Sequence, residues 1–441
     1  MAAAELGVGL IGAGTVGAEV ADRLLTWAPT ISRRAGVGLA LRRVAVRDAG
    51  KARPRVPAEL LTTDAHQVID DPAIAIVVEV AGGEEPARSW IERAIRARKH
   101  VVTANKVVMA AHGPELLELA GEMDVDVYFE AAVGGGIPLI STFKVDLAAN
   151  QLERVTAIIN GTTNYMLSRM AAEGSGFAEV LADAQREGFA EADPTEDVDA
   201  HDAVAKLAIM ASIAFGARVH PRQVYREGIR AVQPVDFRYA RELGYAIKLM
   251  AWAARTPRGV EARVHPTMVP LTHPLAGVDG VHNAVFIEGD LVGQVLLQGL
   301  GAGARPTTSA VIGDLIDLAR SILRGDREVD GLRGVDRQVR NRAPFTFDDI
   351  AVVPMDEVTT RAYFRCTVAD QPGVLAQIFT VFGEEQVSIS SAIQKEVFEG
   401  EASAEFVVTT HPAPDAALRR TRERIAALQP VKAVSSFIRV L

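Results

Sequence analysis

The opening residues of the chain constrain its fold more than any other stretch. The segment LGVGLIGAGTVGAEVADRLL starts as an apolar strand, turns through three glycines and continues as an amphipathic helix. Gly12 allows the tight turn, Gly14 lets the backbone approach a pyrophosphate, and Gly17 lets the helix pack closely on the strand. The free backbone amides at the N-terminus of the predicted helix then favour the negative charge of the pyrophosphate. The segment predicts a dinucleotide-binding unit with these contact residues: Gly12, Ala13, Gly14, Thr15, Val16 and Gly17.

The end of the second predicted strand, LALRRVAVRDAGK, bears on which nicotinamide cofactor is bound. An acidic residue there holds a free ribose hydroxyl, whereas cations accommodate a ribose phosphate. Arg47 lies at this end, with Arg43 and Lys51 nearby and Asp48 as the opposing carboxylate. The balance of charge favours NADP and leaves NAD open. A solvated strand end is the alternative interpretation of these arginines.

Strand and helix signals alternate to about Gly136, which predicts a doubly wound parallel sheet with right-handed crossovers. The later strands are AIAIVVEVAG, HVVTANK and VDVYFEAAVGGG. Ligands in such sheets bind beyond the carboxyl ends of the strands. Three segments at those ends, Ala81–Gly83, Thr103–Lys106 and Glu130–Gly136, are therefore expected to converge on one crevice.

The segment GFAEADPTEDVDAHDAVAK concentrates carboxylates and one lysine ahead of an apolar run, LAIMASIAFG. Asp202 and Lys206 stand four residues apart, so on a helix they lie on the same face. An ammonium group among carboxylates suits a small zwitterionic substrate. A capping box, with Asp193 as cap, Pro194 at the first helical position and Glu196 reaching back, explains the same residues and stays open.

Composition excludes several classes of partner. The net charge is −9 with both signs interspersed, so nucleic acids and anionic membranes are poor partners. No apolar run reaches the roughly 18 residues that a membrane span needs. The first strand begins within a few residues of Met1, which leaves no room for a signal peptide. The single cysteine, Cys366, permits no internal disulfide and suits the cytoplasm, where we expect the protein.

Cysteine and histidine also limit the chemistry. Cys366 lies in the alternating strand YFRCTVAD, far along the chain from the glycine segment. This position argues for a structural role and against a thioester intermediate, which leaves direct hydride transfer to or from a carbonyl or an alcohol. The nine histidines show no paired ligand spacing, so zinc catalysis is not supported.

The pattern divides the chain into consecutive units. Residues 1–136 are the nucleotide-binding unit, completed by a returning helix at about 306–325. Residues 137–305 are predicted to form an antiparallel sheet backed by helices, which binds substrate and pairs subunits. A charged stretch with weak periodicity marks a linker at 326–358. Residues 359–441 follow the strand-helix-strand-strand-helix-strand order of a ferredoxin-like domain.

Five motifs together resemble the homoserine dehydrogenase family: VGLIGAGTVG, VVTANKVVMAAHG, FEAAVGGGIPLI, IINGTTNYML and AEADPTEDVDAHDAVAK. The segment from about residue 360 onward resembles an ACT regulatory domain. The resemblance implies reversible, NAD(P)-dependent interconversion of homoserine and aspartate 4-semialdehyde, a step towards threonine, isoleucine and methionine. Reduction leaves negative charge on the aldehyde oxygen, which an ammonium group neutralises or protonates. The resemblance places Lys106 and Lys206 at the substrate, and we expect Lys206 to be the main proton donor and acceptor while Lys106 orients the oxygen or shares the proton path.

The resemblance also implies the other contacts. The residues expected to bind substrate are Glu191, Asp197, Asp202, Asn160, Gly161 and Thr162. Those expected to reach the cofactor, besides the glycine segment and Arg47, are Thr103 and Lys106. A monovalent cation site, for sodium or potassium, is implied at Glu130, Val133, Gly135 and Ile137. An ordinary strand-to-helix turn after Asn160, and a structural glycine turn after Glu130, remain the alternatives.

The segment DQPGVLAQIF carries the predicted effector contacts. It places Asp370 as a helix cap, Pro372 at the helix start and Gly373 where a small ligand could approach the backbone. Capping alone also explains these residues. ACT domains commonly pair and bind amino acids, so the resemblance implies threonine feedback inhibition with a coupling of roughly 1–3 kcal/mol. It also implies a homodimer through the central sheet, or a homotetramer through paired ACT domains.

Ala200 departs from the family, which usually has glycine at this position. Alanine is the better helix former, so we expect no loss in helical geometry. If the family glycine serves close approach of the substrate, Ala200 tightens the pocket. A sensor that binds the cofactor without turnover is the alternative from another class of function, and both lysines and the three carboxylates argue against it.

Overall fold

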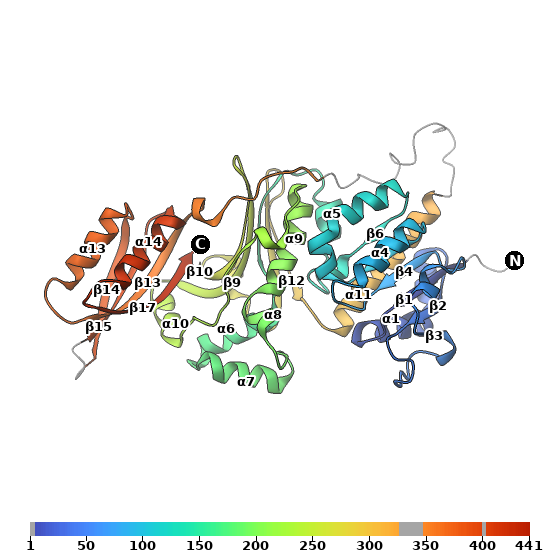
Figure 1. Cartoon of the computed structure of the whole chain (residues 1–441), viewed down its shortest axis with the longest axis horizontal. Helices are drawn as coiled ribbons and strands as arrows, with labels where there is room; N and C mark the ends of the chain where they lie inside the picture. Colours follow the sequence, from blue (N-terminus) through green and yellow to red (C-terminus); the bar gives the residue numbers. More distant parts are fainter. Residues whose placement is uncertain (1–4, 326–346, 399–402) are drawn as a thin grey trace.

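The computed structural model describes residues 5–325, 347–398 and 403–441. They form three units in a row, with the N-terminal and C-terminal units at opposite ends and the central unit between them (Figure 1). In this part of the chain, no helix is long and apolar enough to cross a membrane.

The N-terminal unit is a parallel six-stranded sheet in the order β3-β2-β1-β4-β5-β6, which confirms the doubly wound prediction. The strands are β1 (Glu5–Ile11), β2 (Gly38–Ala45), β3 (Leu61–Thr62), β4 (Ile76–Glu79), β5 (His100–Thr103) and β6 (Val127–Tyr128). The helices are α1 (Thr15–Thr26), α2 (Ala28–Ala35), α3 (His66–Ile69), α4 (Ala87–Arg96) and α5 (Lys106–Glu122). The chain order reverses between β1 and β4, where such sheets open a ligand crevice.

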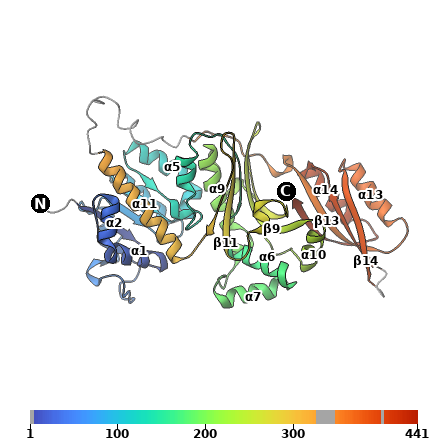
Figure 2. The same ribbon diagram turned by 180° about the vertical axis from the view of Figure 1, so that it is seen from behind.

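The helix α11 (Ala304–Gly325) returns from the central unit to the N-terminal unit, as the sequence predicts. It packs on α1 and α2, and the view from behind shows it crossing that unit beside them (Figure 2). Val311, Leu315 and Leu318 of α11 are fully buried in this core.

The central unit is an antiparallel sheet in the order β12-β11-β7-β9-β10. Its strands are β7 (Leu152–Ile158), β9 (Tyr245–Thr256), β10 (Gly259–Pro270), β11 (His282–Gly289) and β12 (Gly293–Leu300). Its helices are α6 (Gly161–Glu173), α7 (Phe177–Glu187), α8 (Thr195–Val198), α9 (His201–Phe215) and α10 (Pro234–Glu242). This arrangement confirms the predicted sheet backed by helices.

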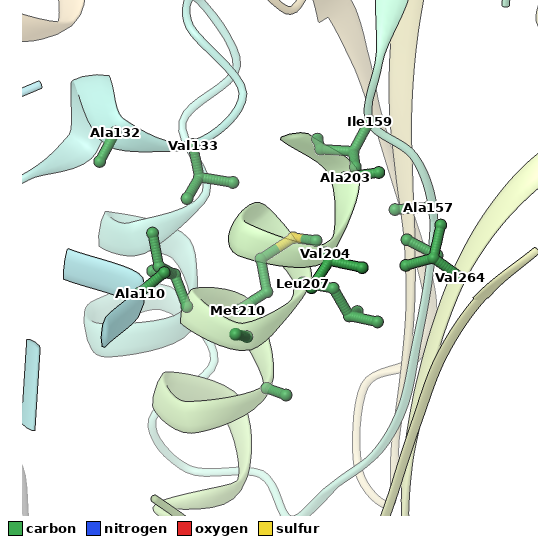
Figure 3. Packing of buried hydrophobic residues seen from close by; sticks show 14 of the residues in the cluster. Ala110, Ala132, Val133, Ala157, Ile159, Ala203, Val204, Leu207, Met210 and Val264 are labelled. Carbon is green, nitrogen blue, oxygen red and sulfur yellow. The ribbon is translucent and has the colours of Figure 1, made fainter. Parts of the chain in front are cut away.

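The helix α9 lies between the N-terminal unit and the central sheet. Figure 3 shows Leu207 and Met210 of α9 between Ala110 of α5 on one side and Ala157 of β7 on the other. A helix that is apolar all round is buried all round. The first turn of α9 therefore enters the boundary between the two units.

The predicted geometry at Ala200 is wrong. Ala200 is not in a helix: it separates α8 from α9 with a left-handed backbone (φ 65°) and is fully buried. This conformation costs a residue with a side chain about 1–2 kcal/mol, whereas glycine adopts it freely. The backbone conformation at this position therefore favours glycine over alanine.

The capping box predicted for the same segment is also only partly present. Pro194 precedes α8 as its cap residue instead of starting the helix, and no side chain caps it. The carboxylate of Asp193 accepts a hydrogen bond from the Thr195 amide (3.1 Å), but no bond joins Glu196 back to the cap among the described residues. A capping box therefore does not explain the carboxylates that follow.

The C-terminal unit has the predicted ferredoxin-like order, with its sheet arranged β17-β13-β15-β14. Its elements are β13 (Thr359–Ala369), α13 (Val374–Glu384), β14 (Ile389–Phe398), β15 (Ser403–Thr410), β16 (Ala413–Pro414), α14 (Asp415–Ala426) and β17 (Val431–Val440). The cap residue of α13 is Gly373 (φ 88°), with no side-chain cap bond, so the prediction of Asp370 as the cap is wrong. Burial raises the pKa of Cys366 to about 12, which keeps this thiol protonated.

One edge of β10 joins the central and C-terminal units, a connection that the sequence does not predict. Val260 pairs with Val352, the short strand β8 (Tyr225–Arg226) pairs with Arg263 and Val264, and Thr267 pairs with Arg439 of β17. The two sheets are therefore one continuous sheet. Of the predicted linker, 347–358 lies partly against β10, and 326–346 lies outside the described residues.

Replacing Ala200 by glycine should test the strain at this turn. Ala200→Gly loses a buried methyl group but relieves the left-handed conformation. Ala208→Gly, in the interior of α9 and equally buried, loses a methyl group and helix propensity with no relief. We expect Ala200→Gly to be more stable than Ala208→Gly by about 1–2 kcal/mol in urea unfolding. Equal stability of the two variants would show that the left-handed backbone of Ala200 is not strained.

Candidate active site

The carboxylate of Asp202 lies between two lysines at the boundary of the N-terminal and central units. The Lys206 ammonium, one helical turn along α9, is 2.7 Å from Oδ2 of Asp202 and donates to the Ile159 carbonyl at 3.0 Å. Lys106, the first residue of α5, contacts Oδ1 of the same carboxylate. The side chains of Asp202 and Lys206 are 4% and 10% exposed, whereas that of Lys106 is 37% exposed.

The charges in this cluster stabilise one another. Burial opposes the charged form of Asp202, but the Lys206 and Lys106 ammonium groups outweigh it and hold the pKa of the carboxyl well below its usual value. Burial likewise disfavours the Lys106 ammonium, yet the charge and hydrogen bond of Asp202 raise the pKa of Lys106 above its ordinary value. Both shifts therefore favour the charged forms of Asp202 and Lys106 in the folded protein.

Asn160 connects this cluster to the start of α6. Its amide nitrogen donates to Asp197 (2.6 Å) and to Asp202 (2.9 Å). Its amide oxygen accepts from the Thr163 backbone (2.9 Å), so Asn160 also caps α6. The strand-to-helix turn and the contact with the carboxylates are thus made by one side chain.

The other three predicted substrate residues belong to the segments around the cluster, and their contacts lie elsewhere. A side chain at Gly161 would lie 2.9 Å from the Val281 carbonyl, so glycine allows this close packing. The Thr162 hydroxyl donates to the Phe189 carbonyl at 2.7 Å. Glu191 is exposed on the connection between α7 and α8.

The glycine turn between β1 and α1 has the form that a dinucleotide requires. A Cβ at Gly12 (φ 99°) would meet Ala81 at 2.8 Å, and one at Gly17 would lie 2.0 Å from the Gly12 carbonyl. Nothing lies within 4 Å of a Cβ at Gly14, so its backbone is open to a ligand. These residues fit a pyrophosphate at the N-terminus of α1.

Two adjoining clefts extend from this turn. The outer cleft, about 1520 Å³, is lined by the turn residues Gly12 to Thr15 together with Arg47, Asp48, Lys51, Arg53 and Arg55. The inner cleft, about 300 Å³, is lined by Val16, Asn105, Lys106, Gly135, Lys206 and Gly301, among others. Gly82 and Gly83 line both clefts, so the strand ends converge as predicted.

The positions of some residues near these clefts differ from those that the sequence predicts. Thr103 is fully buried and donates to Glu79 (2.7 Å), so it lies beneath the cleft and does not line it. Arg43 bonds Gln67 (3.0 Å) and is not among the lining residues. Sequence reasoning missed Arg53, although its position after Arg47 in a basic run was a signal.

The segment after β6 positions the predicted cation residues. The Glu130 carboxylate accepts hydrogen bonds from the backbone amides of Leu139, Ile140 and Ser141. Burial and the nearby Glu130 charge raise the pKa of Asp314 well above its usual value. Among the described residues, no hydrogen bond ends on the carbonyls of Val133, Gly135 or Ile137. Free carbonyl oxygens are the hard ligands that a monovalent cation takes.

Comparison with known proteins agrees with this geometry. Residues 12–130 match the family described as "Homoserine dehydrogenase, NAD binding domain", residues 138–316 match "Homoserine dehydrogenase", and residues 362–429 match the ACT domain. The homoserine dehydrogenase of Synechocystis is 44% identical over 98% of this chain and 99% of its own length. That of Corynebacterium glutamicum is 40% identical, with 99% of this chain and 95% of its own length covered.

Solved structures of homoserine dehydrogenases also resemble this chain. A homoserine dehydrogenase from Thiobacillus denitrificans superposes with a TM-score of 0.91 at 40% identity, covering 99% of this chain and 98% of that one. A hyperthermophilic archaeal homoserine dehydrogenase in complex with NADPH has a TM-score of 0.60 at 26% identity, covering 71% of this chain and 97% of that one. Fold, clefts and relatives agree, and the chain belongs to the homoserine dehydrogenase family, NAD(P)-dependent oxidoreductases, with a C-terminal ACT domain.

Proposed function

We propose that the cluster of Lys106, Asp202 and Lys206 is the catalytic centre at which homoserine and aspartate 4-semialdehyde are interconverted. One observation carries the proposal: two ammonium groups share one buried carboxylate beside the nucleotide cleft. A cation at this position stabilises the negative charge that develops on the aldehyde oxygen. When bound, the nicotinamide cofactor supplies or takes up the hydride.

Lys206 moves the proton, and Lys106 holds the oxygen. The raised pKa of Lys106 keeps that residue charged, which suits a fixed cation. Lys206 lies deeper and uses two of its three N–H donors on Asp202 and on the Ile159 carbonyl, so the third can reach the substrate oxygen. During homoserine oxidation the hydroxyl proton passes to neutral Lys206, and during reduction it returns to the alkoxide oxygen.

The remaining substrate contacts come from the segments around the cluster. Asp197, held by Asn160, and Glu191 offer carboxylates to the substrate ammonium group. Gly161 and Thr162, at the N-terminus of α6, lie where backbone amides favour the substrate carboxylate.

Replacing Lys206 by methionine should lower kcat by about 100-fold or more and flatten its pH dependence, because the group that gains and loses the proton is gone. Initial rates of homoserine oxidation across pH measure this. Lys99→Met is the matched control, since the Lys99 ammonium also donates to backbone carbonyls (Asp71 and Ile74) but lies directly before β5 in the N-terminal unit. A Lys206→Met protein with the wild-type pH profile would contradict the assignment.

The preferred cofactor is NADP, with NAD as the weaker alternative. The outer cleft gathers Arg47, Lys51, Arg53 and Arg55 near the end of β2. The nearby carboxylates are those of Asp48 and of Glu19, which pairs with Arg55, so the cations outnumber them. Such a basic site favours the phosphate that distinguishes NADP.

Reversing the charge at Arg47 should raise KM for NADP by about tenfold or more and leave KM for NAD nearly unchanged. Steady-state rates with each cofactor measure this. Arg43→Glu is the control, because Arg43 lies four residues earlier but bonds Gln67 outside the cleft. If Arg47→Glu and Arg43→Glu behave alike, Arg47 does not select the phosphate.

A monovalent cation is held by the Glu130 carboxylate and the carbonyls of Val133, Gly135 and Ile137. The backbone amides that fix the carboxylate give it one orientation, which supports a built site. Exchange of sodium or potassium for a large organic cation should slow turnover, and an unchanged rate would argue for a structural turn only.

Threonine inhibits the enzyme through the ACT domain. Asp370 is exposed, and a Cβ added at Gly373 would have nothing within 4 Å, so a small amino acid can approach both residues. Removing the whole domain would strip β17 from β10, so a point substitution is the cleaner test.

Asp370→Ala should raise the threonine concentration for half inhibition by about tenfold and leave the uninhibited rate unchanged. Glu423→Ala, on the exposed face of α14 in the same domain, is the control. If Asp370→Ala leaves the sensitivity to threonine unchanged, the effector does not bind at Asp370.

The protein forms a homodimer through the central sheet, or a homotetramer where the ACT domains also pair, and it works in the cytoplasm. Leu296 and Leu300 of β12 are 40% and 47% exposed in the single chain, which supports a partner on this face. Light scattering of the purified protein measures the oligomer, and cell fractionation measures the location.

A further inference from the structure

We infer that Arg230 is a positioning residue for the substrate site, and that the segment Tyr225–Arg230 connects this site to the C-terminal unit. The inference rests on the proposed role of Asp197 in α8 and Asp202 in α9, which flank the turn between these two helices. Contacts on both sides of this segment support it.

On one side, the segment holds the α8–α9 turn. Arg230 makes a two-pronged ion pair with the Asp199 carboxylate, at 2.7 and 3.0 Å. Arg226 donates to the Asp199 carbonyl (3.0 Å), and the Ile229 amide donates to the Val198 carbonyl (2.9 Å). These bonds hold both the side chain and the backbone carbonyl of Asp199, which lies between Asp197 and Asp202 in the sequence.

The segment packs tightly against the α8–α9 turn. A Cβ at Gly228 would lie 2.3 Å from the Val198 carbonyl and 2.8 Å from the Asp199 Cα. Ile229, Val198 and Ala200 are fully buried. The left-handed backbone of Ala200 is disfavoured by itself, so neighbouring contacts must hold it.

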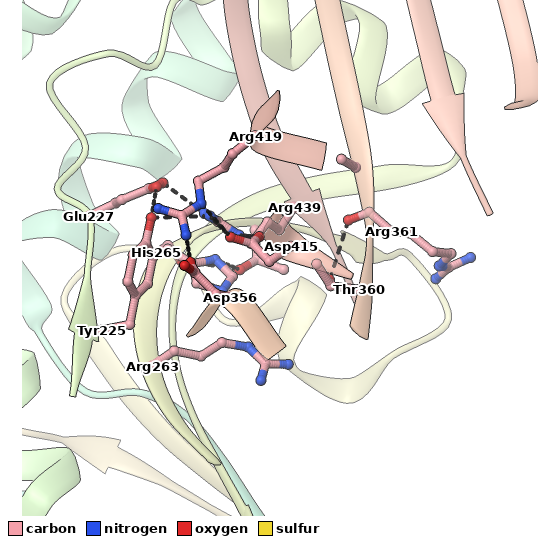
Figure 4. Close-up of polar contacts among 12 residues, drawn as sticks. Tyr225, Glu227, Arg263, His265, Asp356, Thr360, Arg361, Asp415, Arg419 and Arg439 are labelled. Carbon is pink, nitrogen blue, oxygen red and sulfur yellow. Dashed lines mark hydrogen bonds and ion pairs between the residues drawn. The ribbon is translucent and has the colours of Figure 1, made fainter. Parts of the chain in front are cut away.

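On the other side, the segment is tied to β17. The Arg439 guanidinium donates to the Tyr225 hydroxyl (3.1 Å) and lies 3.0 Å from the Glu227 carboxylate. The same guanidinium bonds Asp415 of α14 at 2.6 and 3.1 Å. Figure 4 shows Tyr225, Glu227, Arg439 and Asp415 converging at this junction.

The burial of the junction makes it rigid. Arg439 is 1% exposed and Asp415 is fully buried. Arg439 has little freedom to move, because a shift away from Asp415 would leave a fully buried carboxylate without its charged partner. The position of Tyr225 and Glu227 therefore follows that of the C-terminal unit, and the α8–α9 turn follows the segment.

Kinetics of point variants in the full-length enzyme test the first half of the inference. Arg230→Ala should raise KM for homoserine by about tenfold and leave KM for the cofactor unchanged, since only the substrate turn loses its support. Arg230→Lys should recover part of this loss, because it keeps the charge but not the two-pronged pair.

The matched control is Arg93→Ala, which breaks a two-pronged pair of similar exposure with Asp70 (2.8 and 3.1 Å) in the N-terminal unit. Arg230→Ala and Arg93→Ala proteins with the same KM for homoserine would overturn the role of Arg230. Asp202→Asn separates this result from the proposed function: if it retains full activity, the assigned site is wrong, whereas loss of activity with a silent Arg230→Ala refutes only the positioning role.

The second half is tested with Tyr225→Phe, which removes the hydroxyl that Arg439 contacts and leaves the ring. We expect Tyr225→Phe to raise KM for homoserine. In the double variant with Arg230→Ala, the rise in KM should be smaller than the product of the two single rises, because both residues act through one segment. An unchanged KM in Tyr225→Phe, or independent effects in the double variant, would overturn the connection to the C-terminal unit.

Discussion

The shared carboxylate of Asp202 is the interaction on which the rest of the cleft depends. It forms ion pairs with a lysine from α5 of the N-terminal unit and a lysine from α9 of the central unit. Without this carboxylate, two ammonium groups would face each other in a buried site, which is strongly unfavourable. The same atoms therefore join two structural units and supply the charge that the chemistry needs.

The surrounding fold makes this arrangement possible. The helix α9 is buried between the two units, so Asp202 and Lys206 cannot turn towards solvent. The cap of α6 supplies Asn160, whose amide holds two carboxylates together. The strain at Ala200 belongs to the same turn, because a left-handed residue lets α9 start in a new direction directly before Asp202. Geometry at this site is thus supported by packing well beyond the polar residues themselves.

The C-terminal unit is part of this framework and not a separate attachment. The edge of β10 is covered in turn by Val352, β8 and β17, and the sheet continues across the boundary. Buried polar contacts cross the same boundary: Arg365 pairs with Asp236 of α10 (2.8 Å), and the Tyr239 hydroxyl of α10 donates to Glu405 of β15 (3.0 Å). A domain joined through strand pairing and buried charge moves together with its neighbour more than one joined through a flexible linker.

The sequence alone determined the fold class and the order of the units, and the resemblance of its motifs to the family supplied the residues of the cluster. Glycine spacing, the alternation of strands and helices, and the four-residue step from Asp202 to Lys206 are local patterns, which local physics decides. Only the tertiary structure decided the contacts made across long separations: Lys106 with Asp202, Thr103 with Glu79 beneath the cleft, and β17 with β10. It also corrected the helix predicted through Ala200 and the cap assigned to Asp370, because the φ angles of Ala200 and Gly373 are set by packing that helix propensity does not record.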